Sequence, residues 1–258
     1  MSIGLYAIGT THQSLIYLRK LSPLPFISFL IGASAAILQL IVSYSQLIQS
    51  NHYNFNLFNT ASLISGVIAL GIATLSIRKN LHAITLLFYP IAIVTIATSA
   101  LWGDQKVTMT PDDSGIIIHI TLSIIAYSVL SIAAIQAILI YIQNNNLKKR
   151  NTAVLVRNLP PLLSMEGLLF QMLWSGTALL ATAIFAGFLF VDDLFAQHLA
   201  HKTFFSLLSL AVFSTLLIGR AKYGWRGLTA SKLTLWGASL LMLGFFGSKL
   251  ALEWLLEK

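Results

Sequence analysis

Histidines are the side chains of this sequence best suited to chemistry, and three of the six lie near the starts of two apolar runs that follow residue 114. His198 and His201 come just before one such run, 203–219, and His119 lies near the start of another, 115–141. A neutral imidazole is the commonest side-chain ligand of metal ions and a standard axial ligand of haem iron. These histidines are therefore candidate metal ligands. The alternative is that they are interfacial residues, solvated or bonded to a carbonyl group.

Two lysines accompany these histidines. Lys202 follows His201 directly, and Lys249 lies inside the apolar run 233–254. An amine in an apolar segment must snorkel to the interface, pair with an acid or face a polar cavity. The sequence leaves two interpretations open: simple snorkelling, or neutralisation of an anionic ligand by Lys202 and Lys249 together.

Composition indicates that membrane helices must position these side chains. Of the 258 residues, 57% are hydrophobic and only 9% are charged, whereas a soluble domain carries about 25% charged residues. There is no cysteine, which excludes disulfides, dithiol redox chemistry and a thiolate haem ligand. The sequence also contains no nucleotide-binding glycine loop, G-x-S-x-G elbow or H-E-x-x-H motif. It therefore predicts a membrane protein without a recognisable catalytic constellation.

Eight segments approach the length of about 20 apolar residues that a spanning helix needs. They are 3–18, 24–49, 57–77, 82–101, 115–141, 168–191, 203–219 and 233–254. The first is the weakest, since it is short and contains the polar run TTHQS. The sequence thus predicts an all-α, polytopic bundle of about eight transmembrane helices, forming one integral-membrane domain over residues 1–258.

Basic residues are distributed asymmetrically between the connecting loops. Twelve of the 16 fall in alternate loops: Arg19, Lys20, Arg78, Lys79, Lys148, Lys149, Arg150, Arg157, Arg220, Lys222, Arg226 and Lys232. Cytoplasmic loops of membrane proteins carry such an excess of lysine and arginine. The pattern therefore predicts that both termini are external and that His119, His198 and His201 lie near the outer face.

Several motifs together resemble the cytochrome c assembly protein family, and within it the short bacterial branch of YpjD/HemX-type inner-membrane proteins. The stretches are IIIHITLSIIAYSVLSIAAI, LPPLLSMEGLLFQMLWSGTALLATAIFAGFLF, HKTFFSLLSLAVFSTLLIGRAKYGWRG and FGSKLALE. The distinctive features are a helix-starting histidine with S-x-x-x-Y, then P-P-L-x-S-M-E, H-K-T, G-W-R-G and F-G-S-K. The resemblance extends from about the second apolar segment to the C-terminus.

This resemblance implies an eight-helix bundle that handles haem at the outer membrane face through a pair of histidines. By position, His119 matches the first of the pair, and His201 is the candidate for the second, with His198 as the alternative ligand. The cofactor would be a non-covalently bound b-type haem, and Lys202 and Lys249 would face its propionates. The implied partners are haem, membrane lipid and cytochrome c maturation proteins, with no nucleic acid.

One departure from the family bears on the expected activity. The long haem synthases carry a W-G-x-x-W-x-W-D loop, whereas the corresponding stretch here, VDDLFAQHLAHK, has no tryptophan. The resemblance therefore implies an accessory or regulatory factor in c-type cytochrome biogenesis or haem homeostasis, and not an enzyme, in the bacterial inner membrane. The alternatives are a transporter or ion-efflux accessory protein without haem, or a structural membrane subunit.

The charge asymmetry predicts the orientation of the chain. A reporter fused after Lys149 should read as cytoplasmic and one fused after Asp113 as external, because the loop 142–167 carries four basic residues and the loop 102–114 carries one. Paired alkaline phosphatase and fluorescent-protein fusions measure this directly. An external signal from the fusion after Lys149 would reverse the orientation and move the histidines to the inner face.

Overall fold

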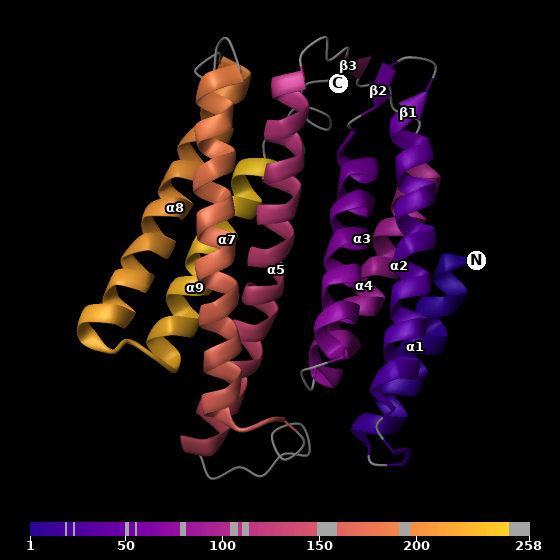
Figure 1. The fold of residues 1–258 in the computed structure, drawn as a ribbon, viewed down its shortest axis with the longest axis vertical. Coiled ribbons are helices and arrows are strands. Elements are labelled where there is room, and N and C mark those ends of the chain that lie inside the picture. The colour runs from indigo at the N-terminus through magenta and orange to yellow at the C-terminus, as the bar shows by residue number, and fades with distance from the viewer. Residues whose placement is uncertain are drawn as a thin grey trace. The chain divides into compact units, whose positions relative to one another are not determined.

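The computed structural model describes residues 1–18, 20–22, 24–49, 52–54, 56–77, 81–103, 108–109, 114–148, 159–190 and 197–247. The chain divides into two compact units, Met1–Pro111 and Asp112–Lys258, called unit 1 and unit 2 below. Each unit is a helical bundle, so the predicted all-α class is confirmed (Figure 1). The prediction of a single domain over the whole chain stays a prediction.

Unit 1 contains four helices and a small sheet (Figure 1). The helices are α1 (Ser2–Tyr17), α2 (Pro25–Leu47), α3 (Leu57–Ser76) and α4 (His82–Trp102). Strands β1 (Ile48–Gln49), β2 (His52–Asn54) and β3 (Thr108–Met109) form an antiparallel sheet in the order β1-β2-β3, with Tyr53 paired to Ile48 and Met109. A proline opens α2, where its missing N–H costs no helical hydrogen bond. Asn56 caps α3 by accepting a hydrogen bond from the Asn59 backbone N–H at 2.7 Å.

Buried polar side chains join the four helices of unit 1. The Tyr6 hydroxyl donates to Gln39 Oε1 at 2.7 Å, and Gln39 Nε2 donates to Ser65 Oγ at 2.7 Å. Ser65 in turn is hydrogen-bonded to Thr95 at 2.6 Å. These residues lie on α1, α2, α3 and α4 respectively, so one chain of hydrogen bonds crosses the whole unit. In an apolar surrounding such bonds fix which helix faces meet.

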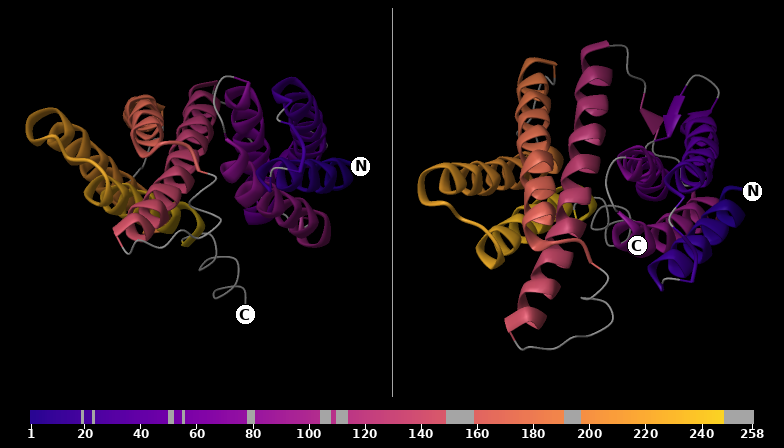
Figure 2. Two further views of the ribbon diagram at one scale, coloured as in Figure 1. Left: turned by 90° about the horizontal axis from the view of Figure 1, so that it is seen from below. Right: turned by 60° about the horizontal axis from the view of Figure 1, so that its bottom comes forward.

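Unit 2 contains α5 (Ser114–Lys148), α7 (Leu162–Phe190), α8 (Gln197–Tyr223) and α9 (Leu228–Met242), followed by a π-helical turn, η1 (Leu243–Gly247). Helices α5 and α7 share the most extensive contact, and α9 packs against both α5 and α8. Helices α8 and α9 form a hairpin through a short turn (Figure 2). The first turns of α5 and α8 and the last turn of α7 lie at one end of the unit (Figure 1).

The eight α-helices in the described part of the chain correspond to the eight expected segments, but several begin or end elsewhere. Helix α5 continues to Lys148 through three asparagines that the sequence places in a linker. Helix α8 begins at Gln197, so His198 and His201 lie in its first turns and not in a loop as expected. Hydropathy marks only the part of a helix that lies in hydrocarbon, because the helix needs no apolar residues once it reaches the interface.

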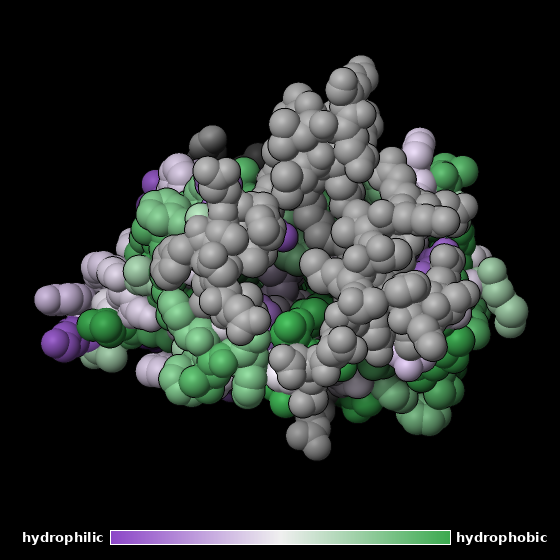
Figure 3. All heavy atoms as spheres, turned by 90° about the horizontal axis from the view of Figure 1, so that it is seen from above, coloured by the Kyte–Doolittle hydropathy of each residue, from purple (hydrophilic) through white to green (hydrophobic). Residues whose placement is uncertain are grey.

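Seven helices are long and apolar enough to cross a membrane among the residues described. Helix α1 is not one of them: its 16 residues rise about 24 Å, below the roughly 30 Å of a bilayer core. This agrees with the expectation that the first segment is the weakest. Hydrophobic residues cover much of the periphery when the helices are seen from above (Figure 3), as lipid contact requires.

The hydrogen-bond chain of unit 1 can be tested at Tyr6. Replacing Tyr6 by Phe removes one hydroxyl and leaves Gln39 Oε1 without its donor, which should lower the free energy of unfolding by about 1 kcal/mol. Thermal or denaturant unfolding in detergent measures this. Tyr44, which is 63% exposed on α2, provides the matched control, and Tyr44→Phe should leave stability unchanged. Equal effects of the two substitutions would show that the hydrogen bond from Tyr6 to Gln39 does not stabilise unit 1.

Candidate functional site

His119 is fixed by a hydrogen bond between α5 and α7. It lies in the second turn of α5, is half-buried, and its Nδ1 is 2.7 Å from the backbone carbonyl oxygen of Ala183 on α7. A carbonyl oxygen only accepts, so Nδ1 carries the proton and Nε2 has the free lone pair. A ligating histidine usually donates its other ring N–H to a carbonyl or carboxylate in this way. The bond to a carbonyl is what the alternative interpretation expects of an interfacial histidine, and in a neutral ring it also leaves Nε2 available to a ligand.

Two glycines allow α5 and α7 to approach each other around this bond. A Cβ atom on Gly187 would lie 2.9 Å from His119 Cε1 and 3.1 Å from Nδ1, so the imidazole occupies the space of the missing side chain. Gly115, one turn before His119, is covered in the same way by the ring of Phe190. Small residues at such contacts let membrane helices pack closely. The orientation of His119 therefore depends on the absence of a side chain at Gly187 of α7.

His201 lies in the second turn of α8 at the same end of unit 2, and its side chain is exposed. Lys202, which follows it, is half-buried. His198 lies in the first turn of α8, and the structure describes only its backbone. Lys249 lies outside the described residues.

The turn η1 links the helices that carry the two histidines. On one side, the ring of Phe245 lies 5.7 Å from the ring of Tyr127, two turns after His119 on α5. On the other side, Gly244 faces α8, where an added Cβ would meet Phe205 Cβ at 2.9 Å and the Lys202 carbonyl oxygen at 3.6 Å. The second turn of α8 and the N-terminal half of α5 therefore both contact η1.

The structure places the beginnings of α5 and α8 at the same end of unit 2, but these two helices are not among the extensively packed pairs, and the described residues form no completed site. Helices α5 and α8 carry His119 and His201 to one end of unit 2 (Figure 1), and no hydrogen bond joins the two imidazoles. Among the residues described, no three His, Cys, Asp or Glu side chains gather into a metal-binding group.

The sequence pointed to His119 but not to the group that orients it. Ala183 and Gly187 stand four residues apart on α7, a small-xxx-small pair of the kind that marks close helix contacts. This spacing is a readable signal that α7 approaches a neighbouring helix there. It does not say which helix approaches, because the contact joins residues 64 positions apart in the chain.

Comparison with known proteins identifies relatives over most of the chain. The model of the family described as Cytochrome C assembly protein matches residues 27–256. The inner membrane protein YpjD of Escherichia coli strain K12 is 28% identical over 197 residues, which cover 76% of this chain and 74% of YpjD. No solved structure matches.

Two further relatives match about half of the chain. An uncharacterized 28.8 kDa protein from a nifR3-like 5' region of Azospirillum brasilense is 32% identical over 141 residues, 54% of this chain and 52% of that protein. Protein HemX of Brevibacillus brevis is 28% identical over 131 residues, 50% of this chain and 48% of HemX. The resemblance seen in the sequence is confirmed, and with seven candidate spans the chain is a multi-pass protein of the bacterial inner membrane.

The contact of Gly187 with His119 can be tested by filling the space. Gly187→Leu forces the imidazole away from the Ala183 carbonyl and should lower the free energy of unfolding by about 1–3 kcal/mol, the usual cost of overpacking. Gly167 on the same helix has no atom within 4 Å of an added Cβ, so Gly167→Leu is the matched control and should be neutral. Detergent unfolding midpoints measure both, and a neutral Gly187→Leu would contradict the packing.

Proposed function

Because this chain belongs to the cytochrome C assembly protein family, we propose that it binds haem non-covalently at the histidine end of unit 2. It acts there as an accessory or regulatory factor in c-type cytochrome biogenesis or haem homeostasis, and not as an enzyme. Membership of the family connects the chain with cytochrome biogenesis or haem handling in general. The observation that carries the finer proposal is the hydrogen bond from His119 Nδ1 to the Ala183 carbonyl.

This hydrogen bond would prepare His119 to hold the haem iron. It holds the imidazole in the tautomer whose Nε2 lone pair is free, and the carbonyl acceptor increases the basicity of that nitrogen. The contact with Gly187 restricts the rotation of the ring. When bound, haem supplies an iron centre whose redox potential depends on its axial ligands.

His201 is the proposed second ligand, with His198 as the alternative one turn earlier on the same helix. The exposed side chain of His201 is free to turn toward a ligand, whereas His119 is already oriented. Lys202 and Lys249 are proposed to face the haem propionates, where an ammonium group forms charge-assisted hydrogen bonds with carboxylates. With the basic loops on the cytoplasmic side, this site lies at the outer face and both termini are external.

The missing tryptophan loop supports an accessory role. The segment between α7 and α8 contains two aspartates and a phenylalanine in place of the tryptophans of the long haem synthases. Without that aromatic surface, the chain has no evident platform on which a haem and a protein acceptor would meet. We therefore propose cytochrome c maturation proteins as the partners that complete the chemistry.

Haem titration of the purified protein tests this proposal. The wild type should take up haemin and give a low-spin Soret spectrum, because His119 and His201 together would supply two imidazole ligands to the iron. His119→Ala and His201→Ala should each change that spectrum, and the double variant should lose specific uptake. His82→Ala in unit 1 is the control: His82 is hydrogen-bonded to Gln13, so its loss should leave the spectrum unchanged.

Two results would revise the proposal. Loss of the spectrum in His198→Ala, but not in His201→Ala, would exchange the two candidates on α8. Failure of the wild type to take up haemin at all would overturn haem binding. It would then favour a transporter or ion-efflux accessory protein.

A further inference from the structure

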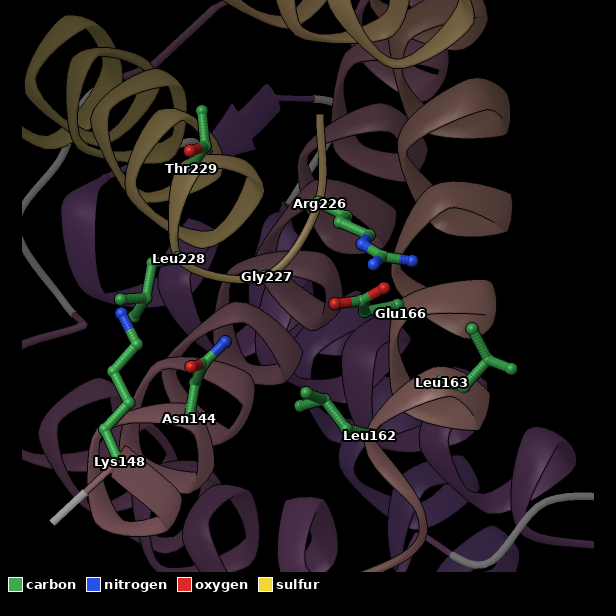
Figure 4. Close-up of a pocket in the computed structure, with 9 residues that line it drawn as sticks. All are labelled: Asn144, Lys148, Leu162, Leu163, Glu166, Arg226, Gly227, Leu228 and Thr229. Atoms are coloured by element: carbon green, nitrogen blue, oxygen red, sulfur yellow. The ribbon is translucent and has the colours of Figure 1, made fainter. Parts of the chain in front are cut away.

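A cavity of about 570 Å³ opens at the opposite end of unit 2 from His119. It is lined by residues of α5, of the start of α7 and of the turn that leads into α9 (Figure 4). Two motifs that the haem site does not use meet here, PPLLSME at 160–166 and GWRG at 224–227. Their residues that line the cavity include Glu166 and Arg226, and α5 contributes Asn144 and Lys148.

The GWRG turn is shaped to reach into this cavity. Gly224 and Gly227 have φ values of 66° and 60°, which only glycine adopts without strain. A Cβ atom on Gly227 would lie 2.8 Å from Asn144 Nδ2 and 3.6 Å from Glu166 Oε1. The backbone at Gly227 therefore packs directly against the polar groups of α5 and α7, and it places Arg226 over the cavity.

Glu166 is the unusual group of the cavity. It is 4% exposed, and it is the only acidic residue in the part of the chain that the structure describes. Within that part its carboxylate has no hydrogen-bond or ion-pair partner, although Arg226 points toward it across the cavity (Figure 4). Its oxygens are not among the fully buried side-chain atoms that lack a partner, so they face the cavity, where a cationic donor can form charge-assisted hydrogen bonds with them. The cavity thus presents a negative site that is open to a ligand.

Two cations stand at the edge of the same cavity. Lys148 and Arg226 both line it and are both exposed, so their charges face the surrounding medium. Lys148 and Asn144 come from α5, whereas Arg226 comes from the turn between α8 and α9 and lies beside Glu166 (Figure 4). Arginine and lysine are the usual ligands of phosphate groups. A ligand that fills the cavity must therefore match one buried negative group and two exposed positive groups.

The position of the cavity indicates where such a ligand comes from. Lys148 ends one candidate span, and Leu162 and Leu228 begin two others, so the cavity lies at the level where hydrocarbon meets water. Leu163, also in its wall, is 72% exposed. Apolar residues at the rim suit acyl chains, and the charged interior suits the headgroup of a lipid.

We propose that this cavity binds the headgroup of an aminophospholipid, with the primary ammonium at Glu166 and the phosphate at Lys148 and Arg226. A primary ammonium carries three N–H donors, which satisfy the carboxylate, whereas a choline headgroup has none. A glycerol headgroup has no positive charge and leaves Glu166 unpaired beside a phosphate. The site therefore distinguishes ethanolamine lipids from both, and this inference is independent of haem binding.

Lipid retention by the full chain tests this proposal. Delipidated protein in detergent is mixed with equal amounts of dioleoyl phosphatidylethanolamine, phosphatidylglycerol and phosphatidylcholine, and native mass spectrometry counts the lipid retained. The wild type should retain the ethanolamine lipid over the other two by about tenfold, which corresponds to one charge-assisted hydrogen bond. Glu166→Gln should lose this preference but still bind, because the phosphate contacts remain.

The charge variants separate the two halves of the headgroup. Lys148→Gln with Arg226→Gln should reduce retention of the ethanolamine and glycerol lipids alike. Lys222→Gln is the matched control, since Lys222 is an exposed cation at the end of α8 that does not line the cavity, and it should change nothing. Because Arg226 and Lys148 are exposed, these variants test the site even if Glu166→Gln does not fold.

Three outcomes would overturn the proposal. One is equal retention of all three lipids by the wild type, and another is a preference that survives Glu166→Gln in folded protein. The third is displacement of the lipid by free phosphoethanolamine at the same concentration, which would assign the cavity to a soluble ligand. Failure of phosphoethanolamine to displace the lipid is the expected result, because the rim leucines contact only the acyl chains and glycerol.

Discussion

A membrane offers no water to the polar groups of this chain, and its packing follows from that constraint. Helices satisfy the backbone, so a buried polar side chain is stabilised when it finds a partner inside its own bundle. In unit 1, the Gln39 side chain accepts a hydrogen bond from Tyr6 and donates one to Ser65. In unit 2 the acceptors are mostly backbone carbonyls: His119 is hydrogen-bonded to the carbonyl oxygen of Ala183, and Ser209 donates to that of Gly237. These few directional bonds decide which helix faces meet, because the apolar contacts around them are nearly interchangeable.

The same constraint explains how far the sequence predicts the fold. Each stretch of about 20 apolar residues became a helix, since no other local structure is tolerated in hydrocarbon. Helix ends were less predictable. Asn144 and His201 are helical although both were expected in loops, because at the interface a helix and a hydrated loop satisfy the backbone equally well. Pairing of helices was not predictable either, since hydropathy gives the length of a helix but not its neighbours.

The candidate site, too, was only partly predictable from the sequence. The histidine end was predictable, because ionisable residues are rare in apolar segments and their positions are conspicuous. Its completion by His201 stays a prediction. The charged cavity was not predicted, although one signal was present: Glu166 is a single acid among loops rich in lysine and arginine. Its meaning depends on Gly227, which lies 61 residues further along the chain and reaches Glu166 only in the folded unit.

Helix α5 has a mechanical consequence for both ends of unit 2. Its 35 residues rise about 52 Å, while a bilayer core is roughly 30 Å thick. A helix longer than the core adjusts to bilayer thickness by tilting. Since His119 and Lys148 lie near opposite ends of one continuous helix, a change in tilt moves them in opposite directions. The thickness of the surrounding bilayer is therefore a physical variable that acts on both ends at once.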